Sequence, residues 1–526
     1  MRCLWTYVQK MRSKELIKDT YLGLEIGSTR IKAVTVNSEN LSPVSGGSFS
    51  WKSDFINGVW TYDLDKAWEG IKYVLSQIKN ADSIKAVGIS GMMHGYLAFD
   101  DDWNLLTSFR TWQNTMTARS AKELTELFNF NIPQRWSSAH LYEAVLSNEP
   151  HVNRVAHITT IAGYIHYMLT GVNSVGIGEA SGIFPIDPEK LGYDEKMLEK
   201  FNAKLLEHGF SKRAEDVFPK VLTAGEPAGC LTEKGAEMLG GLIKVGTPFA
   251  PPEGDAGTGM VATNSISYKT GNISAGTSIF AMVVLEKHLS PIYEEIDMVT
   301  TPDGKPVAMV HCNNCTNDIN AWVSLFKEML NLFGKNVADD ELYTKLYETS
   351  LMGEGDCGGV LVYNYLAGEV LSGLDKGVPM LLRRPDANFN LANMMRSQIY
   401  GALATLKLGM EIFNREKVEI ERFTAHGGLF KTPGVAQRYM AAACNTDIVC
   451  LETSGEGGPY GMALLAAFMN ERYDHSSLDT FLCNRVFANA ESVTLSPTAT
   501  EVEAFNKYIA DYKQMLVVER KAVEST

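Results

Sequence analysis

Long hydrophobic runs are missing from this sequence of 526 residues. The longest apolar runs are short ones such as MALLAAFM (462–469) and IFAMVVL (279–285), whereas a membrane-spanning helix needs about 18 apolar residues or more. The N-terminal segment carries basic residues but has no apolar core followed by a small-residue cleavage site, so it does not resemble a secretory signal. We therefore expect a cytoplasmic protein with no membrane segment.

Basic residues are in the minority. Lys and Arg total 48 against 62 Asp and Glu, which gives a formal net charge of -14. A surface of this sign argues against a protein that binds nucleic acid or long polyphosphates through a basic face. The negative net charge does not exclude a local binding site for a small anion.

Cysteine is sparse as well, with 8 residues in the chain. Only Cys312 and Cys315 have CxxC spacing, and neither a second pair nor histidines at matching spacing accompany them, so we interpret both as buried apolar groups. Three other short motifs are excluded by their sequence context. GNISAGTS (271–278) has P-loop glycine spacing without the lysine, GEGDCG (353–358) precedes a strand instead of following one, and GISGM (88–92) lacks the second glycine of a nucleophile elbow.

The length favours two large domains, because a single core rarely grows beyond about 250–300 residues. Hydrophobic spacing predicts a helix over 64–78 and a buried strand over 84–89, which together indicate an α/β fold. Residues 21–36 read as strand, glycine turn and strand, and 269–286 repeat this pattern about 250 residues later. Such a duplication predicts two domains of similar design with a boundary near residues 255–268.

The second half continues this α/β pattern. Apolar residues recur at helical spacing between Met395 and Phe413, which predicts one buried helix face. Residues 421–452 read as strand, glycine turn, helix and strand, and a further helix opens at Pro459. Turns that lead into a helix suit anions, because unpaired backbone N–H groups and the helix dipole favour negative charge there.

The candidate functional residues are three glycine turns and one acidic residue. The turns are Gly27-Ser28-Thr29, Gly276-Thr277-Ser278 and Gly427-Gly428, where glycine lets backbone amides approach a phosphate and hydroxyls can donate to its oxygens. The acid is Asp255, between Gly254 and Gly257, in a setting that could present a carboxylate in a cleft between domains. Each feature alone is most simply a tight turn, and only their combination and order favour a nucleotide site.

These residues resemble the FGGY family of carbohydrate kinases over nearly the whole chain. The resemblance implies two RNase H-like domains of the actin, hexokinase and Hsp70 superfamily with an interdomain cleft. It rests on LGLEIGSTRIKAV (22–34), GISGMMHG (88–95), TWQNT (111–115), GDAGTG (254–259), SAGTS (274–278), HGGLFKTP (426–433) and EGGPYGMALLA (456–466).

The resemblance also implies a role for single residues. Asp255 would act as the general base that takes the proton of the attacking sugar hydroxyl, and ATP and Mg²⁺ would be the cofactors. From the residues alone, His94 could equally be a satisfied buried histidine and Trp112 a core aromatic. The implied sites are Asp255, Met93, His94 and Trp112 for the sugar; Gly27, Ser28, Thr29, Lys32, Gly276, Thr277, Gly427, Gly428 and Thr432 for ATP; and Glu25 for the metal.

The chain departs from the family pattern at several of these positions. Glu25 stands where the family usually has Asp, and magnesium, which keeps several waters, can tolerate that extra length through outer-shell contacts. On the sugar side, apolar or altered residues replace polar ones at Met92, Ala256, Asn114 and Met116. Lost hydrogen-bonding groups change which hydroxyls a site reads, so the identity of the sugar stays open.

The resemblance divides the chain into an N-terminal extension (1–20, expected to be poorly ordered), a sugar-binding domain (21–262) and a nucleotide-binding domain (263–526). It implies in-line transfer of the ATP γ-phosphate to a ketopentose such as D-xylulose, with L-ribulose or another ketose or polyol as alternatives. A catalytically silent sugar or nucleotide sensor and an Hsp70-like switch belong to other classes. Expected partners are the sugar and ATP, without nucleic acid or membrane, and a homodimer is compatible with the sequence.

Overall fold

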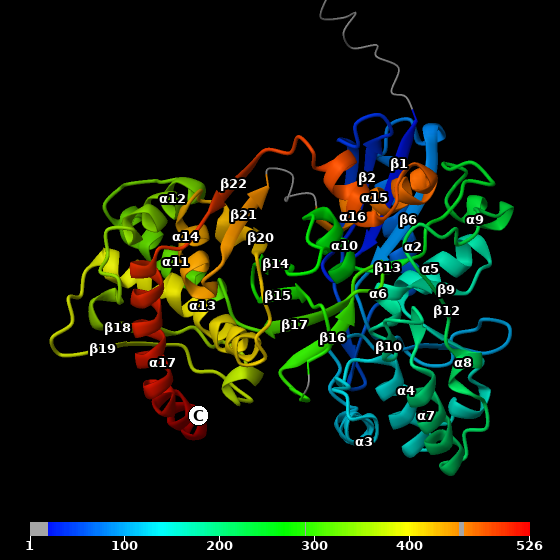
Figure 1. Cartoon of the computed structure of the whole chain (residues 1–526), viewed down its shortest axis with the longest axis horizontal. Helices are drawn as coiled ribbons and strands as arrows, with labels where there is room; N and C mark the ends of the chain where they lie inside the picture. Colours follow the sequence, from blue (N-terminus) through cyan, green and yellow to red (C-terminus); the bar gives the residue numbers. More distant parts are fainter. Residues whose placement is uncertain (1–18, 290, 452–456) are drawn as a thin grey trace, which may run out of the picture. The chain divides into compact units, whose positions relative to one another are not determined.

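The computed structural model describes residues 19–289, 291–451 and 457–526, which fall into two compact units (Figure 1). The N-terminal unit comprises residues up to 262 together with 302–304 and 457–488, and the C-terminal unit comprises the remainder. Most of the predicted extension, residues 1–18, lies outside the described residues, and Thr20 already belongs to the first strand.

A five-stranded sheet with the order β13-β6-β1-β2-β3 forms the centre of the N-terminal unit. Strand β1 pairs antiparallel with β2 and parallel with β6, so the predicted hairpin over 21–36 is confirmed. Every residue of β1 is buried, as expected for a central strand. The strands are β1 Thr20–Ile26, β2 Arg30–Asn37, β3 Pro43–Ser50, β6 Ile84–Gly91 and β13 Glu253–Gly254.

Helix α15 (Gly457–Glu471) packs on this sheet although it follows most of the C-terminal unit in sequence. It contacts β1, β6 and helix α10 (Asp255–Ala262), as Figure 1 shows. Glycine permits this approach, because a Cβ on Gly23 would lie 1.9 Å from the Pro459 carbonyl oxygen. The structure therefore differs from the predicted division, which assigned all of 263–526 to the second domain.

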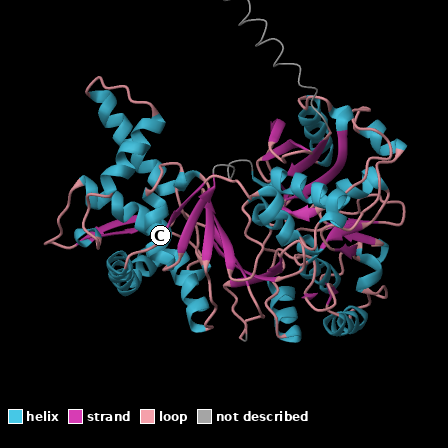
Figure 2. Ribbon diagram, turned by 45° about the horizontal axis from the view of Figure 1, so that its top comes forward, coloured by secondary structure: helices cyan, strands magenta, loops and turns pink. Residues whose placement is uncertain are grey.

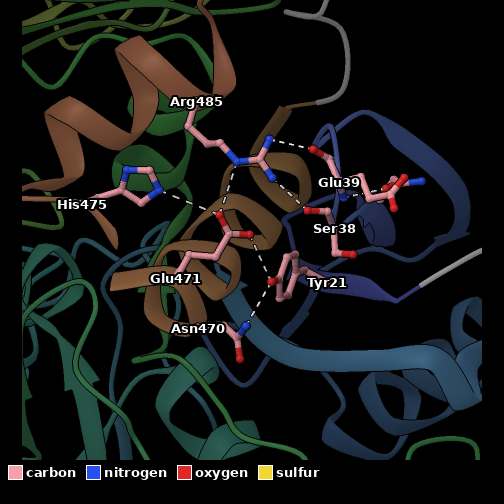
Figure 3. A network of polar contacts seen from close by, with 8 residues as sticks. Tyr21, Ser38, Glu39, Asn470, Glu471, His475 and Arg485 are labelled. Atoms are coloured by element: carbon pink, nitrogen blue, oxygen red, sulfur yellow. Dashed lines mark hydrogen bonds and ion pairs between the residues drawn. The ribbon is translucent and has the colours of Figure 1, made fainter. Parts of the chain in front are cut away.

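A polar network holds the same segment to the sheet (Figure 3). The Tyr21 hydroxyl donates to Glu471 Oε1 at 3.1 Å, and Arg485 Nε lies 3.4 Å from Glu471 Oε2. The Arg485 guanidinium also donates to the carbonyl oxygens of Ser38 and Glu39. Burial, together with the Glu471 charge, raises the pKa of Tyr21 to about 12, so its hydroxyl keeps the proton that it donates.

The N-terminal unit has a second, aromatic core that contains Trp136, Phe184 and Phe201, while α2, α5 and α9 pack in the core on the sheet. Helix α2 covers the predicted range 64–78 closely. The further elements are β4 Asp54–Ile56, β5 Val59–Thr61, α2 Leu64–Ser76, β7 Leu97–Phe99, α3 Ala118–Phe128, α4 Ser137–Leu146, β8 His157–Thr159, α5 Ile161–Thr170, β9 Ser174–Gly176, α6 Ile177–Ala180, β10 Ile186–Asp187, β11 Gly192–Tyr193, α7 Glu195–Glu207, α8 Ala214–Val217, β12 Lys220–Leu222, α9 Glu233–Met238 and α16 Leu478–Phe481.

The C-terminal unit contains a seven-stranded sheet with the order β16-β17-β15-β14-β20-β21-β22. Its segment β17-β15-β14-β20-β21 has the pairing directions of β3-β2-β1-β6-β13 in the other unit, which confirms the predicted duplication. The strands are β14 Thr270–Ala275, β15 Ile279–Val284, β16 Ile296–Thr300, β17 Pro306–Cys312, β18 Val360–Tyr363, β19 Met380–Arg383, β20 Arg422–His426, β21 Asp447–Leu451 and β22 Ser492–Leu495.

Helices accompany the strands in this unit as well (Figure 2). The predicted apolar stripe from Met395 to Phe413 lies on α13, where its residues belong to the main hydrophobic core of the unit. Helix α17 begins with a capping box in which Thr498 and Glu501 satisfy each other's backbone N–H groups. The helices are α11 Asn317–Leu332, α12 Asp339–Ser350, α13 Leu391–Arg415, α14 Val435–Cys444 and α17 Ala499–Ser525.

Candidate active site

Asp255 occupies the first position of α10, directly after the short strand β13. Because β13 pairs with the end of β6, the carboxylate lies against the loop that follows β6, and the Met93 backbone N–H donates to Asp255 Oδ1 at 3.2 Å. One turn further along α10, Thr258 Oγ1 lies 3.1 Å from Ser90 Oγ of β6. Burial, reinforced by the Glu25 charge, raises the pKa of Asp255 to about 6.

Glu25 and Lys32 face each other across the β1–β2 hairpin. They are direct cross-strand partners, and Lys32 Nζ lies 3.3 Å from Glu25 Oε2. Burial raises the pKa of Glu25, and the neighbouring ammonium of Lys32 opposes that rise. The helix α15 reaches the same carboxylate, since a Cβ on Gly458 would lie 2.8 Å from Glu25 Oε1. The predicted metal residue thus sits within electrostatic reach of the predicted base.

The backbone of the Gly27-Ser28-Thr29 turn is fixed by two aromatic residues. The Trp51 indole N–H donates to the Gly27 carbonyl at 2.7 Å, and the Tyr62 hydroxyl donates to the Ser28 carbonyl at 2.7 Å. The Trp51 backbone N–H donates to the Thr29 carbonyl at 3.1 Å. With all three carbonyls occupied, the turn is a rigid feature beside Glu25, and the Thr29 side chain is exposed.

His94 is enclosed by protein. Its Nδ1 lies 3.4 Å from the Gly182 carbonyl oxygen, and its ring stacks near Trp136 at a centroid distance of 6.4 Å. Burial, with a further contribution from the Arg135 charge, holds the pKa of His94 well below its usual value, so the ring is neutral. The interpretation of His94 as a satisfied buried histidine therefore has support, while its position next to Met93 keeps it close to Asp255.

In the TWQNT segment, Asn114 is buried and holds the loop in place, whereas Trp112 is exposed. Asn114 accepts from the Trp60 backbone N–H at 2.9 Å and donates to the Trp60 carbonyl at 2.8 Å, which ties its loop to β5. Trp112 is 39% exposed, so it is not the core aromatic that its sequence context allowed. Its contact with a sugar stays a prediction.

The C-terminal unit brings its two predicted phosphate segments together. Gly427, at φ 107°, follows β20 and packs on the turn after β14, because a Cβ there would lie 2.3 Å from the Ala275 carbonyl oxygen. Gly276 and Gly428 face open space instead, and Thr277 is exposed. The Gly276 carbonyl accepts from the Thr316 hydroxyl at 2.8 Å, which fixes the turn, and Thr432 is buried a few residues after Gly428.

Two buried glutamates near Asp255 were missed by the sequence interpretation. Glu253 accepts from the backbone N–H groups of Gly178 at 3.4 Å and Glu179 at 2.9 Å, and burial raises the pKa of Glu253 to about 8. Glu179 lies on α6 and is fully buried. Only the acids in GIGEASG and PPEGDAG, each placed among small and apolar residues, hinted at them in the sequence.

The two cysteines with CxxC spacing lie inside the C-terminal unit. Cys312 and Cys315 are buried, and burial raises the pKa of both thiols, in keeping with a structural role. Outside residues 1–18, 290 and 452–456, no group of three or more His, Cys, Asp or Glu is placed to hold a metal ion. Over the same residues, no helix combines the length and the apolar character that crossing a membrane requires.

Comparison with known families and proteins gives a consistent result. The FGGY family of carbohydrate kinases matches with its N-terminal domain at residues 20–262 and its C-terminal domain at 271–469. The xylulose kinase of Haemophilus influenzae is 23% identical over an alignment 526 positions long, which covers 94% of this chain and 100% of that relative.

Solved structures share the fold over almost the whole chain. A gluconate kinase from Lactobacillus acidophilus aligns with a TM-score of 0.78 at 16% identity and covers 96% of this chain and 99% of its own. A ligand-bound xylulose kinase from the same organism aligns with a TM-score of 0.77, also at 16% identity, over 96% and 99%. These likenesses and the family match confirm the predicted two-domain α/β fold.

Proposed function

This chain belongs to the FGGY family of carbohydrate kinases, and on that premise we propose that it transfers the γ-phosphate of ATP to a hydroxyl of a ketopentose such as D-xylulose, with Asp255 as the general base. The observation that carries the proposal is the environment of Asp255. Its carboxylate is oriented by the Met93 N–H and lies next to the loop that the family resemblance assigns to the sugar.

The chemistry of Asp255 suits this role. A general base works best when its pKa lies near the operating pH, and burial together with the Glu25 charge raises the pKa of Asp255 to about 6. At neutral pH the carboxylate is ionised and still basic enough to accept the proton of the attacking hydroxyl. A positioned carboxylate of this kind contributes about 10²–10⁴-fold to the rate.

Nucleotide binding is proposed for the glycine turns of both units. A phosphate can approach the backbone closely at Gly276 and Gly428, since a Cβ at either position would meet nothing within 4 Å. The Gly276 N–H donates to the Ser278 carbonyl oxygen at 2.9 Å, so Gly428 is the proposed backbone donor. Lys32 and the hydroxyls of Ser28 and Thr29 are the proposed contacts of the transferred phosphate in the N-terminal unit. Thr277 and Thr432 are the corresponding proposals in the C-terminal unit, with Gly27 and Gly427 shaping the two turns.

Magnesium would neutralise the charge that develops on the transferred phosphoryl group. The residues present fit an ion held mainly by phosphate and water, because Glu25 and Asp255 supply oxygen donors within mutual electrostatic reach and no cluster of three ligands accompanies them among the described residues. Glu25 is the proposed acceptor for a metal-bound water. Lys32 balances its charge when the ion is absent.

The sugar itself is the least constrained part of the proposal. Two solved structures with nearly equal TM-scores carry the names gluconate kinase and xylulose kinase, so the fold does not select the acceptor. Met93, His94 and Trp112 are the proposed sugar contacts besides Asp255. L-Ribulose and other ketoses or polyols remain the alternatives to D-xylulose.

An ADP-release assay over ketoses, polyols and sugar acids tests the proposal. We expect one ketopentose, D-xylulose or L-ribulose, to stimulate ADP release with the highest kcat/KM, and mass spectrometry to detect its monophosphate. A panel in which a polyol or a sugar acid exceeds every ketopentose by tenfold or more would reject the ketopentose assignment and leave the family membership intact.

A further inference from the structure

On helix α6 and strand β11, three buried polar atoms have no hydrogen-bond partner of standard geometry. They are Oε1 and Oε2 of Glu179 and the hydroxyl oxygen of Tyr193. The Glu179 charge helps to raise the pKa of Tyr193, which places the two side chains within electrostatic range. The Thr160 side chain interacts with the Glu179 carboxyl group and lowers its pKa, and beyond this contact neither carboxyl oxygen has a hydrogen-bond partner of standard geometry.

These atoms need an explanation, because a buried polar group without a hydrogen-bond partner destabilises the folded state. The backbone of Glu179 is satisfied, since its N–H donates to Glu253 Oε2 at 2.9 Å. The side chain is the exception, although it is fully buried on an otherwise well-bonded segment. A buried carboxyl group that is fixed in place and has no hydrogen-bond partner of standard geometry in the protein is suited to bind a ligand.

The location of Glu179 indicates what that partner is. A Cβ on Gly254 would lie 2.6 Å from Glu179 Oε2 and 3.0 Å from Met93 Cγ. The carboxyl group therefore reaches the residue that directly precedes Asp255, on the side where Met93 also lies. Met93 is a flexible thioether side chain that can yield to an incoming molecule.

We propose that Glu179 is a specificity-determining residue of the acceptor site, which binds a sugar hydroxyl other than the one that receives the phosphate. This inference rests on the proposed function, because it takes the acceptor of that reaction as the ligand.

The chemistry of the carboxyl group fits a hydroxyl ligand. Burial raises the pKa of Glu179 well above its usual value, and the charges of Glu253 and Asp255 raise it further. A protonated carboxyl both donates and accepts, as a hydroxyl does. It can therefore pair with a sugar hydroxyl in both directions without introducing a second negative charge next to Asp255.

Steady-state kinetics of Glu179→Met test the inference, because methionine keeps the volume and removes the hydrogen bonds. With the best acceptor of the wild-type panel, we expect the acceptor KM to rise and kcat/KM to fall ~10–100-fold, with an unchanged KM for ATP. Wild-type enzyme should discriminate by a similar factor against one singly deoxygenated form of that acceptor, and Glu179→Met should not. Glu179→Gln should recover part of the loss.

The controls separate the possible failures. Glu199 is an exposed residue of α7, so Glu199→Gln should match the wild type in every parameter. If Glu179→Met keeps the acceptor KM and the discrimination of the wild type, the cluster is a water-filled structural site and the inference is wrong. If Glu179→Met fails to fold, Glu179→Gln with unchanged kinetics rejects it equally. If no acceptor stimulates ADP release by the wild type, the proposed function itself fails, and the inference with it.

Discussion

The two hairpins β1–β2 and β14–β15 are copies of one supersecondary unit with different chemistry. Each contains a glycine turn, and the first strand of each pairs parallel with a strand that leads into a functional loop. Two residues before the turn, β1 carries Glu25, paired with Lys32, whereas β14 carries Ser274, paired with Phe280. The N-terminal copy is charged at this position and the C-terminal copy is neutral.

The parallel neighbours show the same contrast. Strand β6 leads to Met93, whose N–H holds the ionisable Asp255, while β20 ends at His426, whose pKa burial lowers, and leads to Gly427 and Gly428. Under the proposed function, one architecture would serve proton and metal chemistry in one unit and phosphate binding in the other. Because the two units share this backbone arrangement, the chemical difference between them lies in the side chains at a few equivalent positions of the strands.

The largest effect is expected from removing the charge of Asp255, which lies in the N-terminal unit. We expect Asp255→Asn to lower kcat ~10²–10⁴-fold while the KM for ATP changes little, because the amide keeps the shape but does not accept the proton. ADP-release assays measure kcat, and their dependence on the ATP concentration gives the KM for ATP. Turnover at the wild-type level would contradict the assignment of Asp255 as the base.

The pH profile follows from the same residue. Asp255 must be ionised to act, and its pKa is about 6, so kcat/KM for the sugar should fall about tenfold per pH unit below that value. Because the folded-state pKa lies above the ordinary value of 3.8, the protonated carboxyl favours the folded state, and this contribution is lost as the pH rises from 3.8 to about 6. Asp255→Asn should therefore melt a few degrees higher than the wild type at pH 8, and an equal or lower melting temperature would contradict this.

Substitutions at two neighbouring glycines, Gly427 and Gly428, test the C-terminal unit. Gly427→Ala should lower the melting temperature, since Gly427 has φ 107° and an added Cβ would lie 2.3 Å from the Ala275 carbonyl oxygen. Gly428→Ala meets open space and should melt like the wild type, but it should raise the KM for ATP several-fold by hindering the approach of the phosphate. Thermal melts and ATP kinetics distinguish the two, and an unaffected KM in Gly428→Ala would argue against a phosphate contact there.

The smallest expected effect compares equivalent positions of the two hairpins. Glu25→Gln should raise the Mg²⁺ concentration needed for half-maximal activity several-fold, because the amide is a weaker acceptor for a metal-bound water. Ser274→Ala at the equivalent position of β14 is the matched control and should leave the Mg²⁺ requirement unchanged. Equal Mg²⁺ curves for the wild type and Glu25→Gln would remove Glu25 from the metal site.

Local patterns predicted many of the elements correctly. The β1–β2 hairpin, α2, β6, α13 and the β20–α14–β21 succession follow from hydrophobic periodicity and glycine turns. The placement of α15 did not follow, because its small-residue contacts with β1 and α10 are between segments more than 150 residues apart in the chain. Sequence spacing carries no information about which distant glycine a helix packs against.

The sequence by itself determined the duplicated α/β design and the family, because these depend on local spacing and on short motifs in order, and the family resemblance marked Asp255 as the proposed base. Only the tertiary structure decided that Glu25 lies within electrostatic range of Asp255, that His94 is neutral and enclosed, and that Glu179 is buried without a hydrogen-bond partner of standard geometry. The physical reason is that pKa values and hydrogen-bond satisfaction depend on desolvation and on neighbours brought together by folding, which the order of residues does not state.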